Sequence, residues 1–124
     1  MQTAVSMKPL FALLTLLAAV CQMVAADKKV VFCAGSPSHA PREHEFRAGC
    51  LLLAKCLEST PGFTTVVASN GWPKDVAVFD GASAVILYAD GGSGHPAIRP
   101  ERLKLLNGLA AKGVGIGAVH YGVE

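Results

Sequence analysis

A chain of 124 residues, with eleven Lys or Arg against nine Asp or Glu, has a formal net charge of +2 and a hydrophobic fraction of 52%. This near-neutral balance gives no electrostatic footprint for nucleic acid or for an anionic membrane, so we expect neither as a partner. The length provides for one small domain at most.

The amino-terminal 26 residues have the three parts of a secretory signal peptide. Lys8 supplies the positive flank, an apolar stretch covers residues 10–20, and small residues ending at Ala26 form the cleavage site. An uncleaved membrane anchor is the alternative, but the stretch is shorter than the roughly 20 apolar residues that span a bilayer. We therefore expect cleavage after Ala26 and a secreted or periplasmic protein with one domain over residues 27–124.

Beyond the signal peptide, the chain alternates strand and helix patterns. Apolar, β-branched runs predict strands, and apolar residues at steps of three and four predict helices. In chain order, we expect a strand at 30–34, a helix at 42–58, a strand at 63–68, a short helix at 74–79, a strand at 84–89, a helix at 100–112 and a strand at 114–119. The helix residues expected to face the core are Phe46, Cys50, Leu53 and Leu57, then Leu103, Leu106 and Ala110, with Gly113 as a carboxyl-terminal cap.

This alternation implies right-handed crossovers and a parallel sheet. We predict an α/β fold of flavodoxin type, with three α/β/α layers and strand order 2-1-3-4. Ligands of such sheets bind outside the carboxyl ends of the strands. His39, His95 and His120 each follow a predicted strand, so we expect them to share one rim. Because no helix follows the fourth strand to cover its second face, we expect the domain to continue beyond Glu124, with further site residues or fused domains there.

Three cysteines remain after cleavage, and an odd number argues against a complete disulfide framework. Cys33 lies in a predicted strand, while Cys50 and Cys56 are six residues apart on a predicted helix and point away from each other. We interpret all three as small core residues. The alternative, a nucleophilic Cys33, lacks a cationic neighbour in the sequence that would lower its pKa.

The rim histidines suggest two kinds of chemistry. One is a divalent metal such as zinc, because catalytic zinc sites use three protein ligands and leave one position open. The candidate metal ligands are His39, His95, His120 and Glu124, with Asp90 as the alternative carboxylate. The other is acid–base catalysis by His95 and His120, with Asp90 as an orienting or accepting carboxylate. The spacing of these residues along the sequence tests neither hypothesis, because they come from separate loops whose positions depend on the fold.

A glycine-rich segment at residues 90–95 follows the third predicted strand. Successive glycines let backbone N–H groups converge on an anion and let a ligand approach the main chain. Gly91, Gly92 and Gly94 are therefore candidate ligand-binding residues. An ordinary turn is the alternative, since the segment matches neither a Walker loop nor a dinucleotide fingerprint.

Three residues near the rim have two interpretations each. Glu43 is a candidate ligand-binding residue, although an acidic residue in a first helical turn usually complements the helix dipole. His44 is expected to be a solvated helix residue, with a site role left open. Trp72 is either a platform for stacking a sugar or, as we favour, an anchor that packs its turn.

Six segments together resemble the ThuA-like, or trehalose-utilisation, family. They are residues 29–35 (KVVFCAG), 38–39 (SH), 43–49 (with EHE and RAG), 70–73 (NGWP), 88–95 (YADGGSGH) and 115–121 (GIGAVHY). This family is similar in fold to class I glutamine amidotransferases and is associated with sugar metabolism. The resemblance implies a flavodoxin-type fold, a site at the strand ends and a domain about twice this length.

A glutamine amidotransferase needs a cysteine nucleophile on a strained strand-to-helix turn. The turn after the fourth predicted strand, residues 119–124, contains His120 but no cysteine, so we expect no such activity. Our hypothesis is an exported ThuA-like domain that acts on or binds a carbohydrate or polyol; its enzymatic version is a carbohydrate-active hydrolase or sugar-modifying enzyme. The alternative is a non-catalytic sugar-binding module of a larger multidomain protein.

Overall fold

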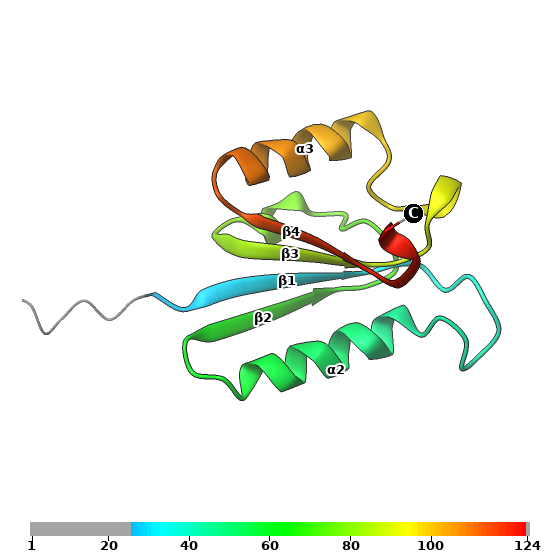
Figure 1. Ribbon diagram of the computed structural model, residues 1–124, viewed down its shortest axis with the longest axis horizontal. Coiled ribbons are helices and arrows are strands. Elements are labelled where there is room, and N and C mark those ends of the chain that lie inside the picture. The colour runs from blue at the N-terminus through cyan, green and yellow to red at the C-terminus, as the bar shows by residue number, and fades with distance from the viewer. Residues whose placement is uncertain (1–25, 124) are drawn as a thin grey trace, which may run out of the picture.

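The computed structural model describes residues 26–123, which form a parallel sheet with one long helix on each face (Figure 1). The predicted signal peptide up to residue 25 and the candidate ligand Glu124 lie outside the described residues. Among the described helices, none combines the length and the apolar composition that a membrane span requires.

The four strands are all parallel and lie in the order β2-β1-β3-β4. Their bounds are β1 Lys28–Ala34, β2 Phe63–Ala68, β3 Ala82–Tyr88 and β4 Gly115–Val119. The helices are α2 Phe46–Glu58 and α3 Pro100–Ala111, with short 3-10 helices η1 Val76–Phe79, η2 Gly92–Gly94 and η3 His120–Val123. This order confirms the predicted flavodoxin-like arrangement, in which the chain leaves β1 and β3 toward opposite faces of the sheet.

The central strand β1 supplies both halves of the core. Val31 and Cys33 pack beneath α3, while Val30 and Phe32 pack against α2, because successive side chains of a strand point to opposite faces. A strand that is buried on both faces has to be apolar throughout, which is why β1 reads as a continuous hydrophobic run.

Helix α2 begins at Phe46, so the predicted helical start at residue 42 is wrong by one turn. Its buried side chains are Phe46, Cys50 and Ala54, whereas Leu53, expected in the core, is 41% exposed. These three buried residues are four positions apart and lie along one narrow stripe of the helix, and Leu53 lies beside that stripe.

Helix α3 turns a slightly different face to the sheet from the one predicted. Leu106 is buried and Leu105 and Leu109 pack beside it, but Leu103 is 45% exposed. Its carboxyl-terminal cap is as predicted: Gly113 has φ +89°, its N–H donates to Ala110 O at 2.9 Å, and Val114 N–H donates to Leu109 O at 3.1 Å. These two bonds define a Schellman motif.

The loops that leave β1, β2 and β3 are tied together at the carboxyl ends of the strands. Gly35 N–H donates to Tyr88 O at 2.9 Å, and Gly71 N–H donates to Ala34 O at 2.9 Å. A Cβ on Gly35 would lie 2.9 Å from the backbone Cα of Ala89, so only glycine allows this approach. These contacts hold the three loops against one another at the rim, where the side chains of the candidate site lie.

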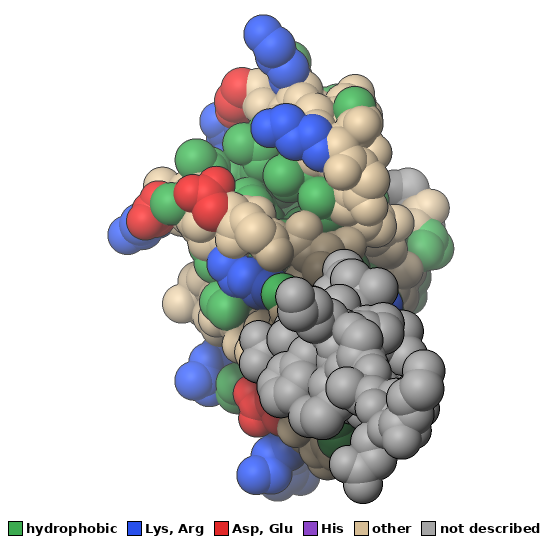
Figure 2. All heavy atoms as spheres, turned by 90° about the vertical axis from the view of Figure 1, so that its left-hand side faces the viewer, with side chains coloured by type: hydrophobic (Ala, Val, Ile, Leu, Met, Phe, Trp, Pro, Cys, Tyr) green, Lys and Arg blue, Asp and Glu red, His purple; other side chains and the backbone are tan. Residues whose placement is uncertain are grey.

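Figure 2 looks onto the opposite end of the molecule, where the strands begin, and shows apolar side chains interspersed with Lys, Arg and acidic residues. None of the described side chains visible on this face is a histidine. The histidines of the described residues lie at the other end of the molecule, at the carboxyl ends of the strands.

Candidate functional site

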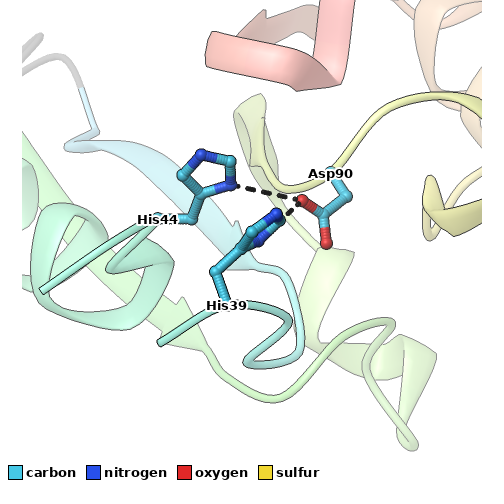
Figure 3. Close-up of side chains that lie close together, drawn as sticks. All are labelled: His39, His44 and Asp90. Carbon is cyan, nitrogen blue, oxygen red and sulfur yellow. Dashed lines mark ion pairs between the residues drawn. The ribbon is translucent and has the colours of Figure 1, made fainter. Parts of the chain in front are cut away.

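Three side chains from two loops converge at this rim (Figure 3). His39 and His44 come from the loop between β1 and α2, and Asp90 follows β3. Oδ1 of Asp90 lies 3.6 Å from Nδ1 of His44 and 3.9 Å from Nδ1 of His39, and the two imidazole centroids are 3.8 Å apart. The potential ligand atoms of the three residues all lie within 4.8 Å of one another.

The position of His44 depends on tight turns that replace the first turn of the predicted helix. Glu43 N–H donates to Ala40 O at 3.0 Å, and Phe46 N–H donates to His44 O at 2.8 Å. Glu45 Oε1 accepts the N–H of Arg42 at 2.7 Å, so this carboxylate holds the loop rather than a helix terminus. The chain thereby brings His44 to the rim before the helix begins.

Backbone strain accompanies these turns. Among the described residues other than glycine, positive φ occurs at Arg42 (76°), His44 (44°), Asn70 (66°) and His120 (61°). Asn, Asp and His adopt this conformation more often than the other L residues, in which Cβ crowds the backbone, so Arg42 is the least usual of the four. Such residues cluster at functional sites, where the surrounding structure holds them in place.

The imidazole of His44 is largely enclosed by other rings. Its side chain is 20% exposed, and Nδ1 is buried without a hydrogen-bond partner. The ring centroids around it belong to His39 at 3.8 Å, His120 at 4.9 Å, Tyr121 at 5.0 Å and Phe46 at 5.9 Å. Buried polar atoms are usually hydrogen-bonded, whereas the carboxylate oxygen Oδ1 of Asp90 lies 3.6 Å from this nitrogen, just beyond hydrogen-bond distance.

The donor set fits a divalent metal. Imidazole and carboxylate ligands suit zinc and neighbouring transition metals, which are bound at about 2.0–2.2 Å. Two ligands of one ion are then at most about 4.4 Å apart, and the 3.6 Å between Nδ1 of His44 and Oδ1 of Asp90 is shorter than that. Ser38 Oγ lies 2.8 Å from Nδ1 of His39, so Nε2 is the ring nitrogen left for a ligand when Nδ1 carries the proton.

His95, predicted as a metal ligand and catalytic group, is engaged elsewhere. Its Nδ1 accepts the N–H of Ala97 at 3.0 Å, which places the proton of the neutral ring on Nε2. Nε2 then donates to Gly122 O at 3.1 Å. In this tautomer both ring nitrogens are occupied, and His95 ties the loop after β3 to the segment after β4.

Within residues 26–123, the predicted ligand His120 also lies outside the cluster of ligand atoms. His120 packs edge-on against Tyr121, with centroids 4.4 Å apart, and lies beside His44 rather than among the clustered ligand atoms. Among the residues the structure describes, two members of the predicted set lie in the cluster: His39 and the alternative carboxylate Asp90. His44 completes the cluster, and the signal that would have found it is the true start of the helix at Phe46.

The predicted glycine loop forms the short helix η2. Gly92 has φ +51°, which favours glycine there. Gly94 N–H donates to Gly91 O and His95 N–H donates to Gly92 O, each at 3.1 Å, so these two groups serve the turn itself rather than a bound anion. Glu43 is exposed and lines a small cavity of about 240 Å³ together with His39 and His44.

A larger cleft of about 540 Å³ lies where the loops after β1, β2 and β3 meet α3. Asp90 belongs to both the histidine cluster and this cleft. The other side chains along it include Ser36, Ser38, Asn70, Trp72, Ser93, His95, Arg99 and Arg102. Trp72 packs on Phe79 with centroids 5.5 Å apart, which agrees with its interpretation as an anchor.

The three cysteines of residues 26–123 are free thiols, and two of them are buried, Cys33 in β1 and Cys50 on α2. Burial raises the pKa of the Cys33 thiol to about 12, with a smaller contribution from Cys50, and burial raises the pKa of Cys50 to about 11. Both are protonated near neutral pH, the opposite of an activated nucleophile. Cys56 is exposed on α2, so its interpretation as a core residue is wrong.

Comparison of the chain with protein-family models, with curated proteins and with solved structures found no match. The fold and the site therefore define the class of protein. The chain is a small parallel four-stranded α/β domain of flavodoxin-like strand order, with two histidines and an aspartate gathered at the carboxyl ends of its strands.

Proposed function

We propose that the chain is an exported ThuA-like domain that binds a carbohydrate or polyol at the carboxyl ends of its strands, assisted by a divalent metal held by His39, His44 and Asp90. The observation that carries the proposal is the buried, unpartnered Nδ1 of His44 beside the Asp90 carboxylate. The ThuA-like motifs support the carbohydrate assignment, because the same loops supply both the motifs and the cluster.

Each cluster residue has a distinct role in this proposal. A bound divalent metal supplies Lewis acidity toward an oxygen of the ligand. Asp90 contributes the negative charge that favours a cation and is 24% exposed, so it can also accept hydroxyl hydrogen bonds from a sugar. Ser38 orients the His39 ring through its contact with Nδ1.

Metal binding is tested on purified protein by titration calorimetry with Zn²⁺ and by elemental analysis after dialysis. We expect one zinc per chain in the parent protein and a loss of affinity of at least about tenfold in His44→Ala and in Asp90→Asn. Asp80→Asn is the matched control, because it removes an exposed carboxylate outside the cluster. Full affinity in His44→Ala together with loss in His95→Gln would reject the cluster in favour of the set predicted from the sequence.

Carbohydrate binding and catalysis are separated by a second experiment. Neutral sugars, acidic sugars and polyols are screened by ligand-observed NMR for binding and by chromatography for turnover, with Asp90→Asn as the variant that removes the shared carboxylate. Turnover that disappears in Asp90→Asn favours a carbohydrate-active enzyme. Saturable binding without turnover favours the alternative, a non-catalytic sugar-binding module. Absence of both across the panel would overturn the carbohydrate assignment.

Glutamine hydrolysis is not part of the proposed function. The buried thiols of Cys33 and Cys50 have a raised pKa, and the turn after β4 presents His120 where an amidotransferase would present its nucleophile. Ammonia release from glutamine at a rate above the buffer control would contradict this part of the proposal.

A further inference from the structure

The cleft on the α3 side of Asp90 contains two arginines that the proposed metal site does not use. We infer that this cleft binds the anionic group, a carboxylate or a phosphate, of an acidic sugar. The inference rests on the proposed carbohydrate function and names the class of sugar that the same rim accepts.

The charge balance of the cleft favours an anion. Arg99 and Arg102 line it, and Asp90 is the one carboxylate among its lining residues. That carboxylate already faces the imidazoles of the cluster. Within residues 26–123, the ion pairs all involve Asp90 and a histidine, so neither arginine has an acidic partner there.

The guanidinium of Arg102 is held in place before any ligand arrives. One of its terminal nitrogens, Nη1, donates to Pro96 O at 2.6 Å, and its central carbon lies 5.4 Å from the centroid of the Trp72 ring. Trp72 is itself fixed against Phe79. A guanidinium carries five N–H donors in a rigid fork, so most of them remain for a carboxylate or phosphate.

The remainder of the cleft suits the hydroxyl groups of a sugar. Ser36, Ser38, Asn70 and Ser93 provide short polar side chains along its length. The loops that carry two of them approach closely, since a Cβ on Gly71 would lie 2.9 Å from Ser36 Oγ. A volume of about 540 Å³ lies within the range of about 300–1,000 Å³ that is usual for small-molecule sites.

The arrangement also explains why an acidic sugar fits better than a free anion. The arginines lie at α3, while Asp90 joins the cleft to the histidine cluster. A sugar that places its anionic group on Arg99 and Arg102 presents its hydroxyl groups toward Asp90 and the serines. An isolated carboxylate or phosphate makes only the first of these contacts.

The test is titration calorimetry of the purified protein with three sugars, namely glucose, glucuronate and a glucose phosphate, and with acetate and inorganic phosphate as simple anions. We expect the two acidic sugars to bind at least about tenfold tighter than glucose, because hydrogen bonds to charged groups are about twice as strong as neutral ones. Arg99→Gln should remove most of this preference. Arg99 is exposed, so its substitution is compatible with folding even if Arg102→Gln is not. Lys104→Gln is the matched control, since it removes one positive charge from α3, the helix that follows Arg99, outside the cleft.

Each outcome decides between the inference and the proposed function. Preference for acidic sugars that Arg99→Gln abolishes and Lys104→Gln retains supports the inference, and the stronger of the two acidic probes identifies the anionic group. Equal affinity for glucose and both acidic sugars overturns the inference while leaving the proposed carbohydrate function in place. Binding of inorganic phosphate or acetate as tightly as the acidic sugars overturns it in favour of a simple anion site. Absence of binding by all three sugars overturns both.

Discussion

Nδ1 of His44 lies 3.6 Å from Oδ1 of Asp90, buried and without a hydrogen-bond partner. The pair joins the loop after β1 to the end of β3, across the point where the chain leaves the sheet toward opposite faces. A buried polar atom without a hydrogen bond lowers the stability of the folded protein, and in the proposed metal site a bound cation would remove that cost.

Replacement of His44 by phenylalanine keeps an aromatic ring in the enclosure and removes the unpaired nitrogen. We expect the free energy of unfolding of the metal-free protein to stay level or to rise by up to about 1 kcal/mol. Zinc at about 100 times the dissociation constant of the parent protein should stabilise the parent by about 2.7 kcal/mol and the variant by at most about 1.4 kcal/mol, if the variant binds zinc at least tenfold more weakly. Urea denaturation with and without Zn²⁺ measures both effects. A metal-free variant markedly less stable than the parent would show that Nδ1 has a partner after all.

Removal of the His95 ring should loosen the connection between the loop after β3 and the segment after β4. His95→Ala loses the bonds to Ala97 N–H and Gly122 O, and we expect a loss of about 1–3 kcal/mol in unfolding free energy. His95→Asn can still accept the Ala97 N–H and should recover part of this loss. Hydrogen exchange of the Ala97 amide should accelerate in the alanine variant and less in the asparagine variant. Equal exchange in all three proteins would contradict the structural role.

Two helical glycines should respond in opposite directions to substitution by alanine. A Cβ on Gly49 would collide with the ring of Tyr88, and a ring cannot yield as a flexible side chain does. A Cβ on Gly108 meets no atom within 4 Å. We expect Gly49→Ala to destabilise the protein by about 1–3 kcal/mol and Gly108→Ala to stabilise it by about 0.5–1 kcal/mol. Chemical denaturation of the two variants measures the difference, and a stabilised Gly49→Ala would contradict the packing of α2 on β3.

The buried thiols should make the fold sensitive to alkaline pH. The pKa values of Cys33 and Cys50 are raised in the folded protein from an ordinary value of 9.0 to about 12 and about 11. Above pH 9 the unfolded chain therefore loses thiol protons that the folded chain retains, and stability falls as the pH rises toward 12. Cys33→Ala, which lacks one of these groups, should show a shallower fall of unfolding free energy over this range. An equally steep fall in both proteins would assign the alkaline sensitivity to other groups.

The same burial predicts selective thiol labelling at neutral pH. Cys56 is exposed on α2, whereas Cys33 and Cys50 are protected and protonated. Iodoacetamide should modify Cys56 in the native protein and reach the other two only after denaturation. Peptide mass spectrometry identifies the labelled positions, and native labelling of Cys33 would indicate an open or partly unfolded core.

Parts of the fold were predictable because their signals are local. The run at residues 63–68 coincides with β2, and the glycine at 113 adopts the left-handed conformation of a helix cap. Helix faces were less predictable: Leu53 and Leu103 match the helical repeat but are exposed. Periodicity identifies that a helix has an apolar side, whereas the exact stripe that is buried depends on where the neighbouring strands lie.

The sequence by itself determined the strands, their parallel order and the edge of the sheet where a site belongs, because hydrophobic runs and the handedness of crossovers are local rules. Only the tertiary structure decided which histidines meet. Tight turns before Phe46 bring His44 next to His39 and Asp90. The ring of His95 is instead hydrogen-bonded to the backbone of Ala97 and Gly122. Contacts between separate loops depend on backbone angles and helix boundaries, and residue spacing along the chain carries no information about either.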